Sequence, residues 1–204
     1  MNPMVENPLN YFRQWVPSRS TLLGELEAEA KTEQIPIIGP VVGQLLYLLA
    51  RIRKPKLILE LGTAIGYSTI YLAKACQSTN GRIISFEISP ALIDRARVNL
   101  SKAGLDHLVE VRGENALEAL ARMQAPAEMI FMDIEKADYI RALPHCSRLL
   151  ISGGLLVADN TGFKDAHPFN QSIYSSEDWE IVNLWSFLPE HSPEHDGLCI
   201  ALRK

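Results

Sequence analysis

The sequence predicts an α/β fold: a mostly parallel sheet of seven strands, covered by helices on both faces, with an antiparallel hairpin at its C-terminal end. From residue 55 onward, short apolar runs alternate with helical segments, a pattern that forms a parallel sheet. The last two strand-like segments are joined by a linker too short for a crossover helix. Parallel neighbours need a dozen or so linking residues, so this pair should be antiparallel.

Composition limits the class of protein. The chain has 204 residues, of which 47% are hydrophobic and 22% charged, so we expect one soluble globular domain, residues 1–204. Its net charge of −4 offers no general attraction for nucleic acid. Cys76, Cys146 and Cys199 are an odd number and form no CxxC pair. This argues against a disulfide framework or a zinc ribbon and favours a cytoplasmic location.

We expect no membrane partner. The N-terminus lacks the basic start and apolar run of a secretory signal. No stretch approaches the ~20 apolar residues needed to span a bilayer.

The N-terminal part, residues 1–54, should form a helical cover. A helix capped by Ser20 or Thr21 continues through Ala30, and prolines 36 and 40 interrupt the pattern. Residues 41–53 then form a second, more apolar helix.

Residues 55–204 should contain the sheet and the functional site. Strands are expected at residues 57–61, 82–88, 108–112, 128–133, 155–159, 179–188 and 197–202. Helices are expected at 67–75, 90–103, 116–123 and 138–150. Pro90 suits the first turn of its helix, and Gly153-Gly154 leads into the fifth strand.

A glycine loop, Gly62-x-x-x-Gly66, follows the first strand and opens a helix. Its spacing is not the GxGxxG of a dinucleotide site. Glu60, two positions earlier, argues against a pyrophosphate ligand and suits a positively charged group such as an ammonium or a sulfonium. The alternative is a turn that only connects strand to helix.

Glu87 ends the second strand, 25 positions after Gly62. An acidic residue at about this place commonly accepts hydrogen bonds from ribose hydroxyls. The alternatives are a helix-capping partner or a solvated strand end. Glu87 and the glycine loop together indicate a nucleoside-containing ligand but do not separate NAD from S-adenosylmethionine.

Oxygen donors follow the fourth and fifth strands: Asp133 after one, Asp159 and Asn160 after the other. Because ligands bind beyond the carboxyl ends of parallel strands, these side chains should converge. Oxygen ligands favour Mg²⁺, with Ca²⁺ or Mn²⁺ as alternatives. Lys136 can reach the same centre. Alternatively, these residues could cap the helices that follow the strands. This alternative is as plausible as metal binding for Asp133 alone, but it does not explain three oxygen donors together with a lysine.

Several motifs together carry a family resemblance. The run from Ile58 to Thr69 resembles the cofactor motif of cation-dependent S-adenosylmethionine O-methyltransferases, the catechol and caffeoyl-CoA O-methyltransferase group, which includes small bacterial members. Phe131-Met132-Asp133 with Lys136 and Tyr139 resembles the family's metal-and-lysine motif, Asp159-Asn160 its second metal motif, and Asp196-Gly197-Leu198 its last strand. The resemblance extends from about Ile35 to the C-terminus and implies the Rossmann-like fold of class I methyltransferases.

The resemblance also implies roles for individual residues. Asp133, Asp159 and Asn160 would bind the cation, and Lys136 would be the base. The implied cofactor-binding residues are Ile38, Glu60, Gly62, Thr63, Gly66, Tyr67, Ser68, Glu87, Ile88, Glu114, Asn115 and Asp133.

Two departures from the family pattern leave questions open. Asn115 stands where many relatives have Asp, so either Glu114 or Asn115 would contact the adenine. Residues 161–176 replace a longer insertion that shapes the acceptor pocket in many relatives, so the acceptor does not transfer with the resemblance.

The implied activity is methyl transfer to a hydroxyl of a small catechol-like or hydroxycinnamoyl-like acceptor. One alternative is modification of a hydroxylated tRNA uridine, with Arg51, Arg53, Lys54 and Lys56 as a phosphate-binding face, which the acidic net charge disfavours. A second is a non-catalytic S-adenosylmethionine-binding module. The family resemblance further implies a homodimer formed through the N-terminal helices. Val41, Leu45, Leu48 and Leu49 offer apolar surface for it, or could equally pack on the sheet.

His191 and His195 are four residues apart beside acidic residues. On a helix this spacing would suit a metal, but Pro193 lies between them. We expect a solvated acidic loop rather than a second metal site.

Overall fold

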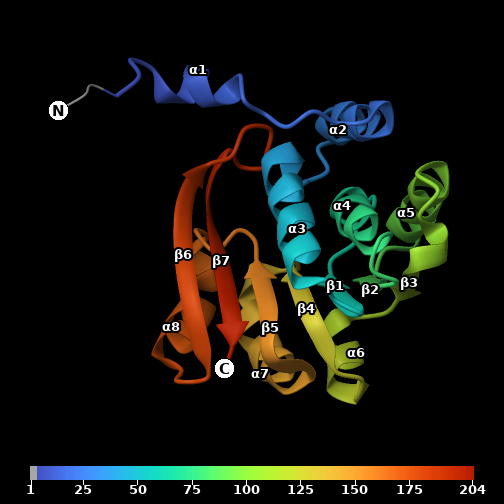
Figure 1. Ribbon diagram of the computed structural model, residues 1–204, viewed down its shortest axis with the longest axis vertical. Coiled ribbons are helices and arrows are strands. Elements are labelled where there is room, and N and C mark those ends of the chain that lie inside the picture. Colours follow the sequence, from blue (N-terminus) through green and yellow to red (C-terminus); the bar gives the residue numbers. More distant parts are fainter. Residues whose placement is uncertain (1–3) are drawn as a thin grey trace.

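The computed structural model describes residues 4–204 and contains one seven-stranded sheet, in the order β3-β2-β1-β4-β5-β7-β6 (Figure 1). The strands are β1 (Leu57–Leu61), β2 (Arg82–Glu87), β3 (Val109–Gly113), β4 (Ala127–Met132), β5 (Leu150–Ala158), β6 (Trp179–Phe187) and β7 (His195–Arg203). β1 to β5 are parallel, and β7 is antiparallel to both β5 and β6. The predicted parallel sheet with a terminal antiparallel hairpin is therefore confirmed.

β5 differs from its prediction because it begins at Leu150 rather than Leu155. Leu150 already pairs with Ala127, and the register then shifts before Leu155 pairs with Met129. Gly153, with φ of +75°, lies in this irregular stretch. The glycine pair thus forms a bulge inside the strand, not a turn before it.

Helices cover both faces of the sheet (Figure 1). They are α1 (Pro8–Arg13), α2 (Thr21–Glu33), α3 (Gly39–Arg53), α4 (Tyr67–Cys76), α5 (Pro90–Lys102), α6 (Ala116–Arg122), α7 (Tyr139–Leu149) and α8 (His167–Ser175). Side chains alternate along each strand: Ile58 belongs to the core under α2 to α5, and Leu59 to the core under α6 to α8. The central strands β1 and β4 are buried on both faces, which explains why they are largely apolar.

α8 lies within residues 161–176, for which the sequence predicts no helix or strand. Phe169 and Ile173 are fully buried on this helix. The Phe169 ring meets Tyr139 of α7 edge-on, with 5.6 Å between ring centroids. The segment is thus part of the core packing.

The N-terminal helices differ in how firmly they pack. Val42 and Leu46 on α3 are fully buried, whereas Leu48 is 48% exposed. α1 has no buried residue and lies across the end of the β6–β7 hairpin (Figure 1). Within residues 4–54 the chain forms α1, α2 and α3, joined by segments that are not helical, and residues 1–3 lie outside the described part.

No helix within residues 4–204 has the length and apolar character needed to cross a bilayer.

Candidate active site

The glycine turn between β1 and α4 packs directly on the segment that follows β4. Gly62 has a φ of +96°, and a Cβ there would lie 2.0 Å from the backbone oxygen of Asp133. The Asp133 amide in turn donates a hydrogen bond to the Leu61 carbonyl at 2.8 Å. Only glycine fits this position, and the close approach fixes Asp133 relative to the turn.

Glu60 lies beneath this turn. It is fully buried and accepts 2.6 Å hydrogen bonds from the hydroxyls of Ser68, Thr69 and Ser85. Burial raises the pKa of Glu60 to about 7, although the three hydroxyl donors act in the opposite direction. The carboxylate therefore orients the start of α4, and its direct contact with a cofactor stays a prediction.

Glu87 sits at the carboxyl end of β2 and accepts three backbone hydrogen bonds. Its Oε2 accepts from the amide of Ala64 at 2.9 Å, and its Oε1 from Ile88 and Ser89 at 2.9 and 3.0 Å. These bonds join the glycine turn to the loop after β2 and hold the carboxylate at the wall of a cleft.

The cleft consists of two adjoining cavities of about 270 and 240 Å³ that share Gly62, Glu87 and the stretch from Asp133 to Glu135. Of the residues predicted to bind a cofactor, those lining it are Ile38, Gly62, Thr63, Tyr67, Ser68, Glu87, Ile88, Glu114, Asn115 and Asp133. Glu60 and Gly66 do not line it. Ile134 and Glu135 also line it and were missed, although their position after β4 could have indicated them.

Asn115 and Glu114 have different partners at one end of the cleft. Asn115 Oδ1 accepts from the amides of Leu117 and Glu118 at 2.9 and 3.3 Å, and so caps α6. The Glu114 carboxylate pairs with Arg122. Within the described residues, the Asn115 Nδ2 group has no hydrogen-bond partner. Asn115 can therefore donate a hydrogen bond to a ligand, whereas the Glu114 carboxylate can only accept one.

Lys136 and Asp133 form an ion pair at the cleft. Lys136 Nζ donates to Asp133 Oδ1 at 2.8 Å and to the Ile134 carbonyl at 3.0 Å. The ammonium also lies 5.7 Å from the ring centroid of Tyr139. Its position is therefore fixed from three sides.

Tyr139 also connects the ends of β4 and β5. Its buried hydroxyl lies 3.2 Å from the Met132 carbonyl and 2.9 Å from the Asp159 carbonyl. This contact holds the two groups of predicted cation ligands at neighbouring strand ends.

Asn160 has an unusual backbone conformation and a fixed amide. Its φ is +51°, in the left-handed region that asparagine tolerates better than most residues. Asn160 Nδ2 donates to Asp196 Oδ2 at 2.6 Å. Since a carboxylate accepts and the amide nitrogen donates, this bond leaves Asn160 Oδ1 as the free acceptor.

The donor set at these strand ends fits a divalent cation in its chemistry. Burial raises the pKa of Asp159; His191 opposes this shift and the charge of nearby Asp133 adds to it. Two neighbouring carboxylates and an amide oxygen are hard oxygen donors. Within residues 4–204 no three His, Cys, Asp or Glu side chains form a metal-binding group. The cation therefore stays a prediction, and it requires the side-chain oxygen of Asn160 as the third ligand.

His191 corrects the sequence interpretation. It is 5% exposed, and its Nε2 lies 3.0 and 2.8 Å from the two carboxylate oxygens of Asp159. Burial lowers the pKa of His191, but the Asp159 carboxylate outweighs this effect and the net shift is upward. The expectation of a solvated loop is wrong for this residue, whereas His195 is exposed.

The cause of the burial is a contact between distant segments. A Cβ at Gly39, the first residue of α3, would lie 2.7 Å from the backbone of Glu190. The β6–β7 loop, residues 188–194, therefore packs against the start of α3. Local sequence does not reveal this contact.

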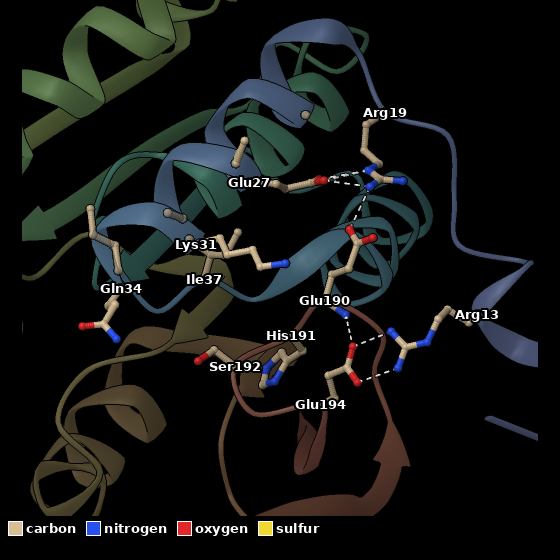
Figure 2. A pocket seen from close by; sticks show the side chains of 14 residues that line it. Arg13, Arg19, Glu27, Lys31, Gln34, Ile37, Glu190, His191, Ser192 and Glu194 are labelled. Atoms are coloured by element: carbon tan, nitrogen blue, oxygen red, sulfur yellow. Dashed lines mark hydrogen bonds and ion pairs between the residues drawn. The ribbon is translucent and has the colours of Figure 1, made fainter. Parts of the chain in front are cut away.

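A third cavity, of about 680 Å³, lies between α1, α2 and the β6–β7 loop (Figure 2). Arg19 reaches both Glu27 and Glu190 across it, and Arg13 reaches Glu194 (Figure 2). His191 lines this cavity, and Ile35 and Ile37 line both it and the cleft. The cavity is therefore polar and adjoins the group of Asp133, Lys136, Asp159 and Asn160.

The basic cluster considered for tRNA lies elsewhere. Arg51 and Arg53 lie in the last turn of α3, and Lys54 and Lys56 lie between α3 and β1. They therefore lie at the amino edge of the parallel strands, opposite the cleft.

Comparisons with known proteins identify the family of this chain. The sequence profile of a family described as O-methyltransferase matches residues 17–168. The chain is 39% identical over 127 residues to a catechol O-methyltransferase of Niastella koreensis, covering 60% of this chain and 57% of the relative. It is 35% identical over 119 residues to a catechol O-methyltransferase of Mycobacterium tuberculosis, covering 58% and 54%. These alignments thus span only a little over half the length of the curated relatives.

Solved structures match over more of the chain. The O-methyltransferase TomG of Streptomyces achromogenes, in complex with SAM, has a TM-score of 0.84 at 26% identity and covers 96% of this chain and 95% of its own. An O-methyltransferase of Bacillus cereus, in complex with SAH, also has a TM-score of 0.84 at 26% identity, with 96% of each chain covered. With a profile that matches well over half of the sequence and a Rossmann-like sheet of the same form, this chain belongs to the O-methyltransferase family.

Proposed function

We propose that this protein is an S-adenosylmethionine-dependent O-methyltransferase that methylates a hydroxyl of a small acceptor with two vicinal oxygens, catechol-like or hydroxycinnamoyl-like, and that it requires a divalent cation. One observation carries the proposal: the Lys136–Asp133 ion pair and the Asp159–Asn160 pair lie at neighbouring strand ends, beside a cleft lined by the expected cofactor residues.

S-adenosylmethionine would bind in the cleft. The glycine turn and Ser68 would hold the methionine part, Glu87 the ribose hydroxyls, and the Asn115 amide the adenine. The two relatives that were solved with SAM and with SAH support this choice of cofactor. When bound, the cofactor supplies a methyl group activated by a sulfonium, and the protein mainly supplies proximity and alignment.

Asp133, Asp159 and Asn160 would hold the cation, with Mg²⁺ as the first expectation and Ca²⁺ or Mn²⁺ as alternatives. A bound cation supplies positive charge that orients the acceptor oxygens and lowers the pKa of a hydroxyl. Asp196 would keep the Asn160 oxygen turned toward it.

Lys136 would take the proton of the reacting hydroxyl at its Nζ atom. Asp133, the Ile134 carbonyl and the Tyr139 ring hold that nitrogen in place. The same contacts stabilise the protonated ammonium, so Lys136 would act as a base only after losing that proton, which the positive charge of a cation held by Asp133 would favour.

The acceptor would enter through the 680 Å³ cavity, which adjoins the proposed cation ligands through His191. Its wall of charged groups suits a polar acceptor. Placement of the basic cluster at the opposite edge of the sheet disfavours tRNA. A cytoplasmic location, consistent with three free buried cysteines, and a homodimer remain proposals.

A methyl-transfer screen tests the proposal. Catechols, hydroxycinnamoyl thioesters and tRNA are offered with labelled cofactor, with Mg²⁺ or with a chelator, to the wild-type protein and to Lys136→Ala and Asp159→Ala. We expect cation-dependent labelling of a small acceptor that both variants lose. Labelling of tRNA alone would show that the acceptor is tRNA and not a small molecule. Cofactor binding without any methyl transfer would favour a non-catalytic binding module.

A further inference from the structure

A groove of about 590 Å³ lies between α3 and α4, bordered by the start of α2 (Figure 1). We call it the basic groove, because Arg19, Arg51 and Lys74 line it. No Asp or Glu of residues 4–204 lines it. It shares no lining residue with the cofactor cleft, and it meets the polar cavity only at Arg19. The proposed function therefore leaves this groove without a role.

We propose that the basic groove binds the phosphate or diphosphate group of a small soluble molecule, held by Lys74, Arg51 and Arg19. The site lies outside the proposed active site, so the inference does not depend on the proposed function.

The first argument is that two cations of the groove have no counter-charge within the described residues. Lys74 is half-buried, and burial lowers its pKa with no carboxylate to oppose the shift. Arg51 is exposed, and its Nη1 donates to the Tyr47 hydroxyl at 3.3 Å, with the guanidinium 5.8 Å from the centre of that ring. A partly buried ammonium without a partner is costly, and an anion between these two side chains would offset that cost.

The second argument concerns Arg19, which is held from outside the groove. Its Nε and Nη2 atoms bond the Glu27 carboxylate, and Nη2 also pairs with Glu190 at 2.7 Å. Nη1 takes part in none of the hydrogen bonds or ion pairs of residues 4–204, so it is the free donor of this guanidinium. The side chain is thus fixed in position and still able to bond a ligand.

The third argument is a missing hydrogen-bond partner. Tyr71 lines the groove and is 4% exposed, and its hydroxyl has no partner within the described residues. Buried hydroxyls are nearly always hydrogen-bonded, and a ligand oxygen in the groove would supply an acceptor. Ser20 and Leu23, which also line the groove, lie at the start of α2. The beginning of a helix adds partial positive charge, which again favours an anion.

The size and chemistry of the groove favour a small phosphorylated ligand over a nucleic acid. Its volume lies within the range of about 300–1,000 Å³ that is typical of small-molecule pockets. Gln44 and Gln77 line it and add amide donors to the two kinds of cation, a combination that suits phosphate oxygens. The net charge of −4 provides no wider attraction for RNA.

The experiment titrates untagged, full-length protein with inorganic pyrophosphate, and separately with inorganic phosphate, by calorimetry in a chloride buffer that contains a chelator. Lys74→Gln and Arg51→Gln each remove one cation from the groove. Lys54→Gln is the matched control, because this exposed lysine follows α3 but does not line the groove. Thermal melts with and without pyrophosphate establish that each variant is folded and provide a second measure of binding.

We expect saturable binding of one pyrophosphate per chain, which weakens as chloride rises. The Kd should increase about fivefold or more in Lys74→Gln and in Arg51→Gln, since each loses a charge-assisted hydrogen bond, and less than about twofold in Lys54→Gln. Pyrophosphate should raise the Tm of the wild type and of Lys54→Gln more than that of the other two variants.

Absence of saturable binding of both anions would overturn the inference. Equal losses in all three variants would also overturn it, because they would indicate a general electrostatic attraction without a defined site. Bulk tRNA is the last probe: tRNA binding that Lys54→Gln and Arg51→Gln weaken equally, and that pyrophosphate does not displace, would identify a nucleic-acid surface in place of a small-ligand site. None of these measurements involves methyl transfer, so the proposed function is tested separately.

Discussion

The cofactor cleft and the polar cavity beside it are built in different ways. Residues that line the cleft directly follow strands, as Gly62 follows β1 and Asp133 follows β4. The cavity is closed by ion pairs between segments far apart in the chain, such as Arg13 with Glu194 and Arg19 with Glu190. The sheet topology therefore fixes the cleft, whereas the cavity depends on contacts near the surface.

The contacts in the two regions also differ in the free energy that is lost when they are broken. The cleft rests on buried polar contacts, such as those of Glu60, which are costly to break. Partly exposed ion pairs like those around the cavity contribute little to stability, because solvent and salt screen them. Substitutions should therefore be tolerated better at the polar cavity, where the acceptor is proposed to enter, than at the cofactor cleft. The following experiments test that expectation.

The largest effect should come from Lys136→Ala. We expect kcat to fall by about 10²–10⁴, since a positioned general base contributes that much. Cofactor affinity, measured by calorimetry, should change less than about threefold. Lys164→Ala, at an exposed lysine before α8, is the control and should keep full activity. Equal losses in both variants would contradict the role of Lys136.

Gly62→Ala should damage the cleft severely. The new Cβ would meet the Asp133 carbonyl oxygen, so we expect a loss of about 3 kcal/mol or more in unfolding free energy. Gly104→Ala is the matched control, because Gly104 also has a positive φ, +68°, but nothing lies within 4 Å of its added Cβ. It should cost only about 1 kcal/mol. Urea unfolding measures both, and similar losses would show that backbone strain alone matters.

Glu60 should give the protein a measurable dependence on pH. Its folded pKa of about 7 lies above the unfolded value of about 4.5, so between these values the folded state binds more protons. Stability should therefore fall as pH rises from about 4.5 to 7 and then level off, by a total on the order of 3 kcal/mol.

Glu60→Gln should remove this contribution. The difference in unfolding free energy between wild type and Glu60→Gln is measured by urea at several pH values. The wild type should lose stability relative to the variant across this window. A constant difference would show that Glu60 titrates in the folded protein as it does when unfolded.

The smallest effect should come from Arg13→Gln at the cavity. Its pair with Glu194 is partly exposed, so we expect a rise in acceptor KM of about two- to fivefold, weaker at high salt. The Kd for the cofactor should stay unchanged, since Arg13 does not line the cleft. A large loss of cofactor binding would break the distinction between the two regions.

The sequence by itself determined the parallel sheet and the terminal hairpin, and the family resemblance named ten of the residues that line the cleft. Their patterns are local: apolar runs of strand length, a glycine turn, and polar residues at strand ends that parallel pairing must bring to one edge. Placement of Asp133 next to Gly62 follows directly from that topology.

Only the tertiary structure decided the burial of Glu60 and His191, the helix at residues 167–175 and the charged cavity. Each depends on contacts across long stretches of chain, such as Gly39 with Glu190 and His191 with Asp159. Such contacts leave no periodic pattern in the sequence. A histidine in a loop with proline is usually solvated, and here packing of the loop against α3 buries it beside Asp159.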